Sequence, residues 1–221
     1  MKKYVFALMA FVSATAAAQG KFDTQNFDGF TVHVYQPADS ETDGSLIIES
    51  RSGLVIVGES KDAVFQDYLG RFTKPVVQTV TNDMPLGTTQ NWNGVEIAFR
   101  MSTYGTSKAD VMIGRSLLLT KGLTLKAHAN DKVISKPEDI DAQLNNANIL
   151  LHTGCSKFVD EKGHISDTSL PRFLQKYYST MKKAYKKATG AESFVNAMQK
   201  AYPGLDGEDD LKQVAQQLFK N

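Results

Sequence analysis

The sequence predicts an α/β protein in which strands dominate the first part of the chain and helices its last third. Between Phe30 and about Asn130, short apolar runs alternate with polar turn residues, as in half-buried or buried strands. From Leu170 onward, apolar residues recur every three or four positions. This spacing is typical of helices that bury one face and expose the other.

The first residues predict a secretory signal. Lys2 and Lys3 lead into an apolar run from Tyr4 to Ala17, and the small residues 16–18 fit a cleavage site. Removing this signal peptide, residues 1–18, would leave one domain over 19–221. The expected location is the periplasm of a Gram-negative bacterium or the medium. No later stretch approaches the roughly 20 apolar residues of a membrane span.

Composition limits the class of protein further. Hydrophobic residues make up 42% of the chain and charged residues 22%, which excludes disordered and fibrous proteins. The 25 Lys and Arg nearly balance the 24 Asp and Glu, and losing Lys2 and Lys3 would make the net charge only slightly negative. A near-neutral chain is not expected to bind nucleic acid. A single cysteine, Cys155, excludes an internal disulfide framework.

A β-hairpin followed by a βαβ unit is expected early in the chain. Ser45–Glu49 and Leu54–Val57 are apolar runs on either side of a glycine-containing turn. Apolar residues at helical spacing then predict a helix over Asp62–Leu69, and Pro75–Val80 returns to a strand pattern. We therefore expect Leu54–Val57 and Pro75–Val80 to be parallel neighbours.

The rest of the chain supplies further elements. Additional strands are expected at Thr31–Tyr35, Val95–Phe99, Asp110–Gly114, Ser116–Thr120 and Asn148–Leu151. A polar helical segment, Pro137–Leu144, precedes the last of these strands. Three closing helices are expected over Leu170–Ala188, Phe194–Ala201 and Leu211–Leu218.

This order of elements resembles the metallo-β-lactamase fold, an αββα sandwich. The Ser45–Val57 hairpin resembles that family's opening hairpin. The segment Asn148-Ile149-Leu150-Leu151-His152-Thr153-Gly154 resembles the strand and loop where the family usually has Pro-Gly-His-Gly. The stretch from Leu170 resembles the closing helices of its hydrolases. The resemblance covers most of residues 19–221 and implies an α/β sandwich with a helical C-terminal third.

The sequence departs from this family at its zinc-ligand motif. The family carries Thr-His-x-His-x-Asp-His after its second parallel strand, because imidazoles and carboxylates hold zinc and leave a position for an activated water. Here the strand runs into Thr81-Asn82-Asp83-Met84-Pro85-Leu86-Gly87. Asn82, Met84, Leu86 and Gly87 therefore stand where the resemblance would place three histidines and an aspartate.

The family's other ligand positions are changed too. Its middle histidine would fall near Thr106, its metal-bridging aspartate near Arg115, and its last histidine on Thr153. The resemblance implies one cleft, whose candidate ligand-binding residues are Asn82, Asp83, Met84, Thr106, Arg115, His152 and Thr153. Arg115 would repel a divalent cation and suit an anionic ligand. No cofactor is expected, with zinc as the alternative.

One other group of soft ligands is present in the sequence. His152, Cys155 and His164 could clip a copper or zinc ion, although no fourth ligand is evident. Cys155 with either histidine could also form a thiol nucleophile and its base. The alternative interpretation is a small buried cysteine and two ordinary loop histidines.

Two functions follow from the sequence. The first is an exported metallo-β-lactamase-fold protein with a degenerate metal site that binds a small molecule or a partner protein without catalysis. The alternative is a hydrolase of the same superfamily with an atypical metal set, and metal content distinguishes the two. If the resemblance is accidental, the chain has another α/β fold, which the strand order would reveal.

Overall fold

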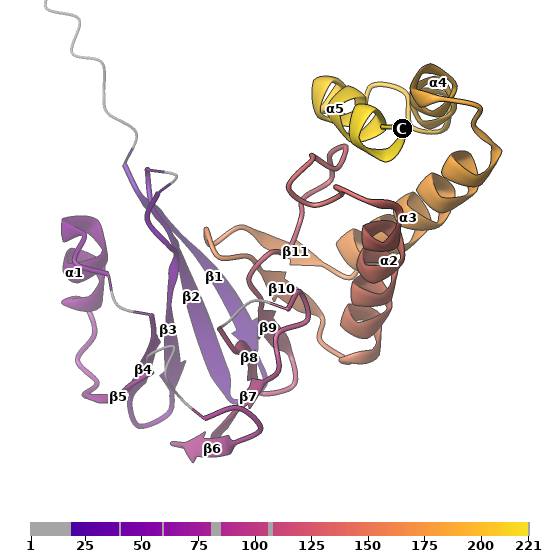
Figure 1. Ribbon diagram of the computed structural model, residues 1–221. Helices are drawn as coiled ribbons and strands as arrows, with labels where there is room; N and C mark the ends of the chain where they lie inside the picture. The colour runs from indigo at the N-terminus through magenta and orange to yellow at the C-terminus, as the bar shows by residue number, and fades with distance from the viewer. Residues whose placement is uncertain (1–18, 40, 59, 81–84, 106–107, 221) are drawn as a thin grey trace, which may run out of the picture.

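The computed structural model describes residues 19–39, 41–58, 60–80, 85–105 and 108–220, which form two mixed sheets and five helices (Figure 1). The strands are β1 (Lys21–Phe27), β2 (Phe30–Gln36), β3 (Ser45–Ser50), β4 (Leu54–Val57), β5 (Val76–Val80), β6 (Thr89–Trp92), β7 (Val95–Arg100), β8 (Asp110–Ile113), β9 (Leu117–Leu119), β10 (Lys157–Val159) and β11 (Ile165–Asp167). The helices are α1 (Ala63–Leu69), α2 (Pro137–His152), α3 (Ser169–Lys187), α4 (Ala191–Ala201) and α5 (Glu208–Leu218).

Each sheet contains one parallel pair of strands. The first sheet has the order β1-β2-β3-β4-β5, and only β4 and β5 are parallel. The second has the order β11-β10-β9-β8-β7-β6, and only β9 and β10 are parallel. The β3–β4 hairpin and the parallel β4–β5 pair joined through α1 confirm the two units expected from the sequence.

The interior of the sandwich is an apolar cluster to which both sheets contribute. Alternate residues of the first sheet, such as Val32, Val34 and Ile48, face residues of the second sheet such as Ile97 and Ile113. All five side chains are fully buried. The period-two alternation of the strands therefore places one face of each sheet in a shared core.

Helices cover the outer faces of both sheets. On the first sheet, Phe65 of α1 packs with Tyr35, Ile47, Leu54 and Ile56. On the second, Leu118 and Phe158 belong to a larger cluster built with α2, α3, α4 and α5. Figure 1 shows α1 outside the first sheet and the four other helices on the far side of the second. The layers are thus helix, sheet, sheet and helix, the αββα sandwich that the sequence predicted.

The expected strand at Asn148–Leu151 is wrong, because these residues form the last full turn of α2. Ile140, Ala147 and Leu150 recur at helical spacing and are buried, whereas Ile149 is 39% exposed. A short apolar run fits a strand or a buried helix equally well, and only its neighbours decide between them. The strand that follows α2 is β10, which begins nine residues later than expected.

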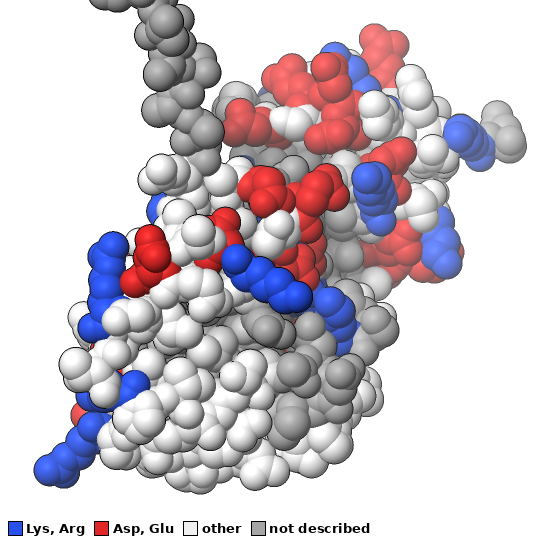
Figure 2. Space-filling view, turned by 90° about the vertical axis from the view of Figure 1, so that its left-hand side faces the viewer, with Lys and Arg blue, Asp and Glu red and all other residues white. Residues whose placement is uncertain are grey.

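Charged side chains of both signs adjoin each other on the face shown in Figure 2. They concentrate in its upper part, whereas the lower part, at the height of β5 and β6 in Figure 1, is dominated by uncharged residues. Among the described residues, none of the helices combines the length and the apolar character that crossing a membrane requires.

Candidate functional site

Four of the residues expected in the ligand cleft, Asn82, Asp83, Met84 and Thr106, lie outside the described residues. The other three are placed. Arg115 lies in the β8–β9 turn with its side chain 78% exposed, and its Nε is 3.3 Å from Glu96 Oε1. Thr153 ends α2, and its hydroxyl donates to the Leu150 carbonyl at 2.7 Å.

The soft-ligand group does not assemble. The imidazole of His152 turns back along α2, with Nδ1 2.7 Å from the Asn148 carbonyl oxygen. Cys155 is buried under the helices, and burial raises the pKa of its thiol, which disfavours a thiolate. His164 lies beyond β10, with Nδ1 2.8 Å from Asp160 Oδ2. Within the described ranges, no three His, Cys, Asp or Glu side chains are placed to hold a metal ion.

A different group of charged residues gathers where the parallel strands end. Parallel strands present their carboxyl ends at one edge of a sheet, where ligands of α/β proteins commonly bind. Here, a cavity of about 180 Å³ lies beyond Val57 of β4 and Leu119 of β9. We call it the carboxyl-edge pocket, and its lining residues are Asp43, Gly44, Ser45, Val57, Gly58, Leu119, Lys121 and Glu161.

Close backbone contact joins the two sheets beside this pocket. The Gly44 N–H donates to the Glu161 carbonyl at 2.8 Å. A Cβ on Gly44 would lie 2.7 Å from the Gly163 nitrogen, and one on Gly163 would lie 2.5 Å from the Tyr35 carbonyl oxygen. Gly163 also has a φ of 84°, which other residues rarely adopt. The β2–β3 loop and the β10–β11 turn can approach this closely only because both positions are glycine.

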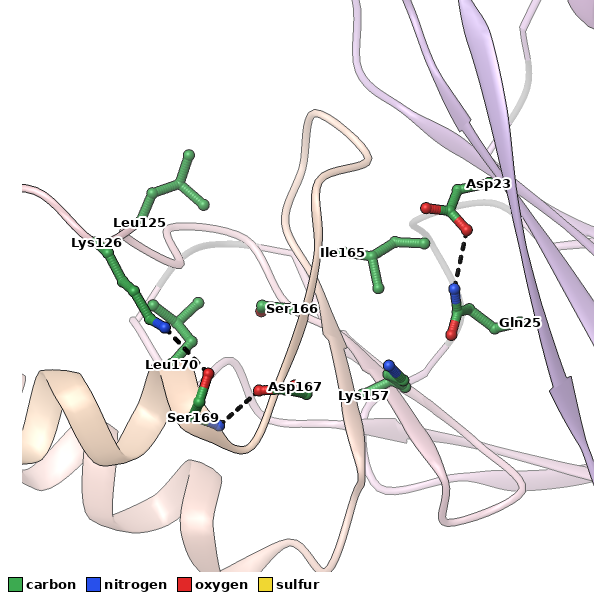
Figure 3. A pocket seen from close by; sticks show the side chains of 10 residues that line it. All are labelled: Asp23, Gln25, Leu125, Lys126, Lys157, Ile165, Ser166, Asp167, Ser169 and Leu170. Carbon is green, nitrogen blue, oxygen red and sulfur yellow. Dashed lines mark hydrogen bonds between the residues drawn. The ribbon is translucent and has the colours of Figure 1, made fainter.

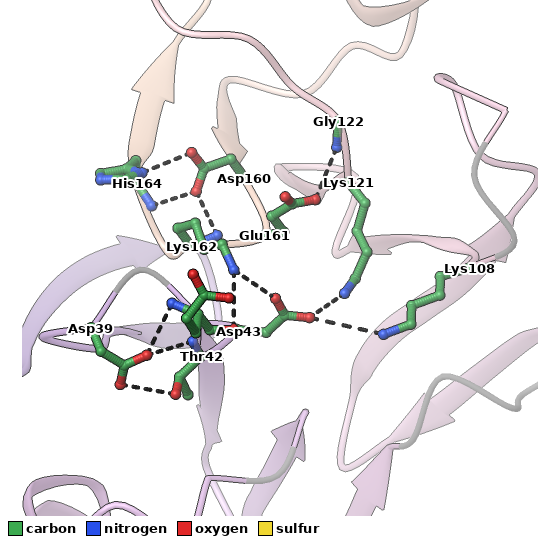
Figure 4. A network of polar contacts seen from close by, with 11 residues as sticks. Asp39, Thr42, Asp43, Lys108, Lys121, Gly122, Asp160, Glu161, Lys162 and His164 are labelled. Atoms are coloured by element: carbon green, nitrogen blue, oxygen red, sulfur yellow. Dashed lines mark hydrogen bonds and ion pairs between the residues drawn. The ribbon is translucent and has the colours of Figure 1, made fainter. Parts of the chain in front are cut away.

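Three lysines surround one carboxylate at the pocket (Figure 4). Lys121 Nζ contacts Asp43 Oδ2, Lys162 Nζ lies 3.2 Å from Oδ1, and Lys108 Nζ lies 3.8 Å from Oδ2. The Glu161 carboxylate accepts the Gly122 N–H at 3.3 Å. The Lys121 side chain is only 16% exposed. Three ammonium groups therefore converge on the Asp43 carboxylate, and the Glu161 carboxylate lines the same pocket.

The short distances between these charged groups shift the pKa values of Asp43, Lys108 and Lys121. Burial alone would raise the pKa of Asp43, but hydrogen bonds from Lys121 and Lys162 bring it below its ordinary value. The neighbouring Lys121 ammonium lowers the pKa of Lys108. Burial would lower the pKa of Lys121, yet its bond to Asp43 raises it instead. The protonated form of Lys121 is therefore favoured, and its positive charge disfavours the protonated form of Lys108.

Neighbouring polar groups fix the segments that carry these lysines. Asp160 Oδ1 accepts the N–H groups of Lys162 and His164 at 2.9 and 2.8 Å, which shapes the turn after β10. Asp110 is buried and accepts the Thr120 hydroxyl at 2.7 Å, directly before Lys121. Burial raises the pKa of Asp110.

Sequence reasoning missed Asp43, Lys108, Lys121 and Lys162. The sequence carries a signal for two of them. Lys121 follows the apolar run Leu117–Leu119, and Lys162 follows Phe158 and Val159 in a turn that contains Gly163. A strand at Asn148–Leu151 would place the strand end elsewhere, so this prediction hides the loop after β10.

The chemistry of the lining residues bears on whether this pocket can hold zinc. A protonated lysine has no lone pair to donate to a metal ion, and its charge repels a cation. The described lining residues include no histidine or cysteine. The described part of the pocket therefore does not fit a zinc ion.

Comparison with known proteins gives likenesses of fold. No protein-family model matches the chain. No curated protein matches it either. Among solved structures, a metallo-β-lactamase from Pontibacter korlensis is 13% identical with a TM-score of 0.48, over 72% of this chain and 99% of that one. A metallo-β-lactamase from Hirschia baltica is 13% identical with a TM-score of 0.43, over 72% and 97%.

A third similar structure is a flavo di-iron protein from Thermotoga maritima, 10% identical with a TM-score of 0.43, over 75% of this chain and 62% of that one. At such identities the likeness concerns the fold and no activity. Two mixed sheets with helices outside both, and with helices in the C-terminal part, give this chain an α/β sandwich fold.

Proposed function

We propose that the protein is an exported binding protein that takes a small anionic ligand in the carboxyl-edge pocket and does not catalyse hydrolysis. The observation that carries this proposal is the convergence of three ammonium groups on Asp43. Lys121 and Lys162 each contact a different oxygen of its carboxylate, and Lys108 Nζ lies 3.8 Å from it. A ligand oxyanion beside Lys121 would reduce the repulsion between these ammonium groups.

The size of the pocket supports a small group. Sites for drug-sized ligands measure about 300–1,000 Å³. The carboxyl-edge pocket, at about 180 Å³, suits a carboxylate or phosphate group, either free or at the end of a larger ligand. In this proposal, lysine side chains supply the positive charge that pairs with the bound anion. Arg115, the cation expected from the sequence, points to solvent and pairs with Glu96.

Export rests on the N-terminal pattern of Lys2, Lys3 and the apolar run that follows. We propose the periplasm or the medium as its location. Mass spectrometry of protein recovered from the native compartment is expected to give an N-terminus at or near Gln19. Recovery of only full-length protein from the cytoplasm would refute export and leave the binding proposal untouched.

Calorimetric titration tests the binding function, with inorganic phosphate, acetate and succinate as probes at low ionic strength. We expect at least one probe to saturate, and Lys121→Gln to weaken it by about tenfold or more, as expected for a lost charged hydrogen bond. Lys186→Gln is the matched control, because Lys186 is exposed in the last turn of α3. Its affinity should equal that of the unsubstituted protein.

Two outcomes would overturn this function. One is the absence of saturation by all three anions at millimolar concentration. The other is stoichiometric zinc, iron or manganese that survives dialysis and supports hydrolysis of a β-lactam or ester, which would favour the hydrolase. Without such metal retention, we expect no β-lactamase activity.

A further inference from the structure

The two sheets leave unpaired edges on the same side of the sandwich. β1 is the last strand of the first sheet and pairs with β2, and β11 is the last strand of the second and pairs with β10. Within the described residues, no backbone hydrogen bond joins β1 to a segment other than β2. Figure 3 shows β1 across an open space from the β10–β11 hairpin.

Two adjoining cavities, of about 430 and 260 Å³, lie between these edges and share Asp23 and Ile165. We call the pair the β1–β11 groove. Lys21, Asp23 and Gln25, which alternate along β1, line one wall of the groove, and β11 with the start of α3 lines the other. The groove therefore follows β1 for five residues, a length of about 17 Å.

Strand β1 is held in place by packing on one face and by its pairing with β2. On the other face of the sheet, the Phe22 ring stacks on Tyr68 of α1 with centroids 3.8 Å apart and also contacts Tyr35 and Phe65. All seven residues of β1 pair with β2 in one continuous register, without a bulge. A strand fixed in this way presents its free edge without first having to fold.

The free edge of β1 also lacks the usual protection against pairing. Natural edge strands are blunted by shortness, bulges, proline or several charges. β1 has seven residues, no proline, and only Lys21 and Asp23 as charged residues. By contrast, β5 at the opposite edge has five residues and a register shift against β4, and β11 has three. The exposed edge of β1 is thus better suited to accept another strand than the edges of β5 and β11.

The hairpin register identifies which groups of β1 are available. Phe27 and Phe30 pair across a two-residue turn, and such a closing pair exchanges hydrogen bonds within the hairpin. Residues 25, 23 and 21 then bond to β2 in the same way. Phe22, Thr24 and Asn26 consequently direct their N–H and C=O groups toward the free edge.

Charges on the far wall of the groove favour an acidic side chain. Lys126 and Lys157 both lie near the Asp167 carboxylate, which already accepts the Ser169 N–H at 2.8 Å. Lys126 Nζ donates to the Ser169 hydroxyl at 3.1 Å. On the near wall, Asp23 accepts a hydrogen bond from Gln25 at 2.9 Å. An acidic group opposite Gln25 would meet two ammonium groups that share one carboxylate.

We propose that an extended peptide segment of a partner protein adds to β1 as a sixth strand of the first sheet, with an acidic side chain directed into the β1–β11 groove. The peptide backbone bonds to Phe22, Thr24 and Asn26. Its inward side chains fill the space toward β11, because stacked sheets lie about 10 Å apart. Main-chain bonds give affinity, and Lys126 with Lys157 selects the acidic position.

The test measures fluorescence anisotropy of a labelled octapeptide of alternating threonine and valine with one central glutamate. Three proteins are compared: the unsubstituted protein, Thr24→Pro and Thr24→Val. Thr24→Pro removes an N–H at the free edge and leaves the bonds to β2, since proline is tolerated at such edge positions. Thr24→Val keeps the N–H and loses the same hydroxyl, so it is the matched control.

We expect the peptide to saturate the unsubstituted protein and Thr24→Val alike, and Thr24→Pro to weaken it by about tenfold. Replacing the peptide's glutamate with glutamine should weaken binding to the unsubstituted protein but not to Lys157→Gln. Absence of saturation at millimolar peptide, or equal binding by Thr24→Pro and Thr24→Val, would overturn the proposal.

A change on the peptide side makes the test independent of the folding of Thr24→Pro. An octapeptide methylated on alternate backbone nitrogens cannot donate to β1, and we expect it not to bind the unsubstituted protein. Undiminished binding of this peptide would contradict strand addition. A concentration-dependent dimer that Thr24→Pro abolishes would also overturn the proposal, because a second copy of this chain would then occupy the edge.

Discussion

The carboxyl-edge pocket and the β1–β11 groove both take residues from the hairpin formed by β10 and β11, yet they present different chemistry. At the pocket, the side chains of Lys108, Lys121 and Lys162 come from separate loops and converge on Asp43. Charged side chains are therefore its main feature. In the groove, the free backbone of β1 is the main feature, and charged side chains lie on the far wall. One edge of a sandwich can thus recognise charge, and another can recognise an extended backbone.

The difference has a physical consequence for how each site responds to change. Interactions between charged groups depend on salt, on pH and on the balance of neighbouring charges. Backbone hydrogen bonds between strands depend mainly on the presence of each N–H and C=O. Experiments that change the charge interactions but leave the backbone hydrogen bonds intact should therefore affect the pocket and not the groove.

Gly163→Ala should break both sites and have the largest effect. The new Cβ would lie 2.5 Å from the Tyr35 carbonyl oxygen at a φ of 84°. We expect the free energy of unfolding to fall by about 3 kcal/mol, from backbone strain and overpacking combined. Urea unfolding measures this change.

Gly154→Ala is the control for Gly163→Ala, because its φ is 77° and a Cβ there would meet nothing within 4 Å. It should lose only the strain, about 1 kcal/mol. Equal losses in the two variants would show that the contact between the β10–β11 turn and the first sheet contributes little to stability.

Asp43→Asn should separate the pocket from the groove. Without this carboxylate, Lys108, Lys121 and Lys162 lose their shared partner. Because Asp43 is partly exposed and screened by solvent, we expect unfolding to become easier by only about 1 kcal/mol. Phosphate should bind more tightly and raise the melting temperature more than in the unsubstituted protein.

The octapeptide that tests the β1–β11 groove should bind Asp43→Asn with unchanged affinity. Asp67→Asn, an exposed position on α1, removes the same charge away from the pocket and should leave phosphate binding unchanged. If phosphate binds Asp43→Asn more weakly than the unsubstituted protein, Asp43 belongs to the anion site as a direct partner and not as a competitor.

Acid should remove the contribution of Asp43 to stability. Its pKa in the folded protein lies below the ordinary value of 3.8, so its stabilising effect is present above that pH. This contribution is lost as the pH falls through the lowered pKa. We expect the difference in unfolding free energy between the unsubstituted protein and Asp43→Asn to shrink as the pH falls below about 4. A difference that grows toward acid would contradict this assignment.

Salt should produce the smallest and most selective effect. Raising sodium chloride from about 0.05 to 0.5 M shortens the Debye length severalfold and adds a competing anion. We expect phosphate binding to weaken severalfold, whereas a groove peptide with glutamine in place of glutamate keeps its affinity. Parallel losses for both ligands would show that charge also dominates the groove.

Local patterns in the sequence were sufficient for much of the fold. Leu54–Val57 and Val76–Val80 form the expected parallel pair, and the apolar stripe of Leu170, Leu174 and Met181 is buried in α3 as its spacing predicted. These elements are visible because their apolar residues repeat with the period of the structure they form. The αββα layering itself was an expectation from the resemblance to the metallo-β-lactamase fold.

Short or polar elements left no such pattern. β1 and β6 contain few apolar residues, and β10 and β11 have three residues each, so periodicity could not reveal them. The run Asn148–Leu151 misled for the same reason, since four residues do not distinguish a strand from a helical turn. These strands depend on neighbours that are distant in the sequence.

The sequence by itself determined the α/β class of this chain and most of its longer apolar strands and helices. Only the tertiary structure determined which charged side chains lie next to one another. Asp43, Lys108, Lys121 and Lys162 come from four separate loops, and 119 positions separate the first from the last. Apolar burial leaves a local period in the sequence, whereas an ion network depends on which loop ends meet, and this depends on the strand order and on how the two sheets pack.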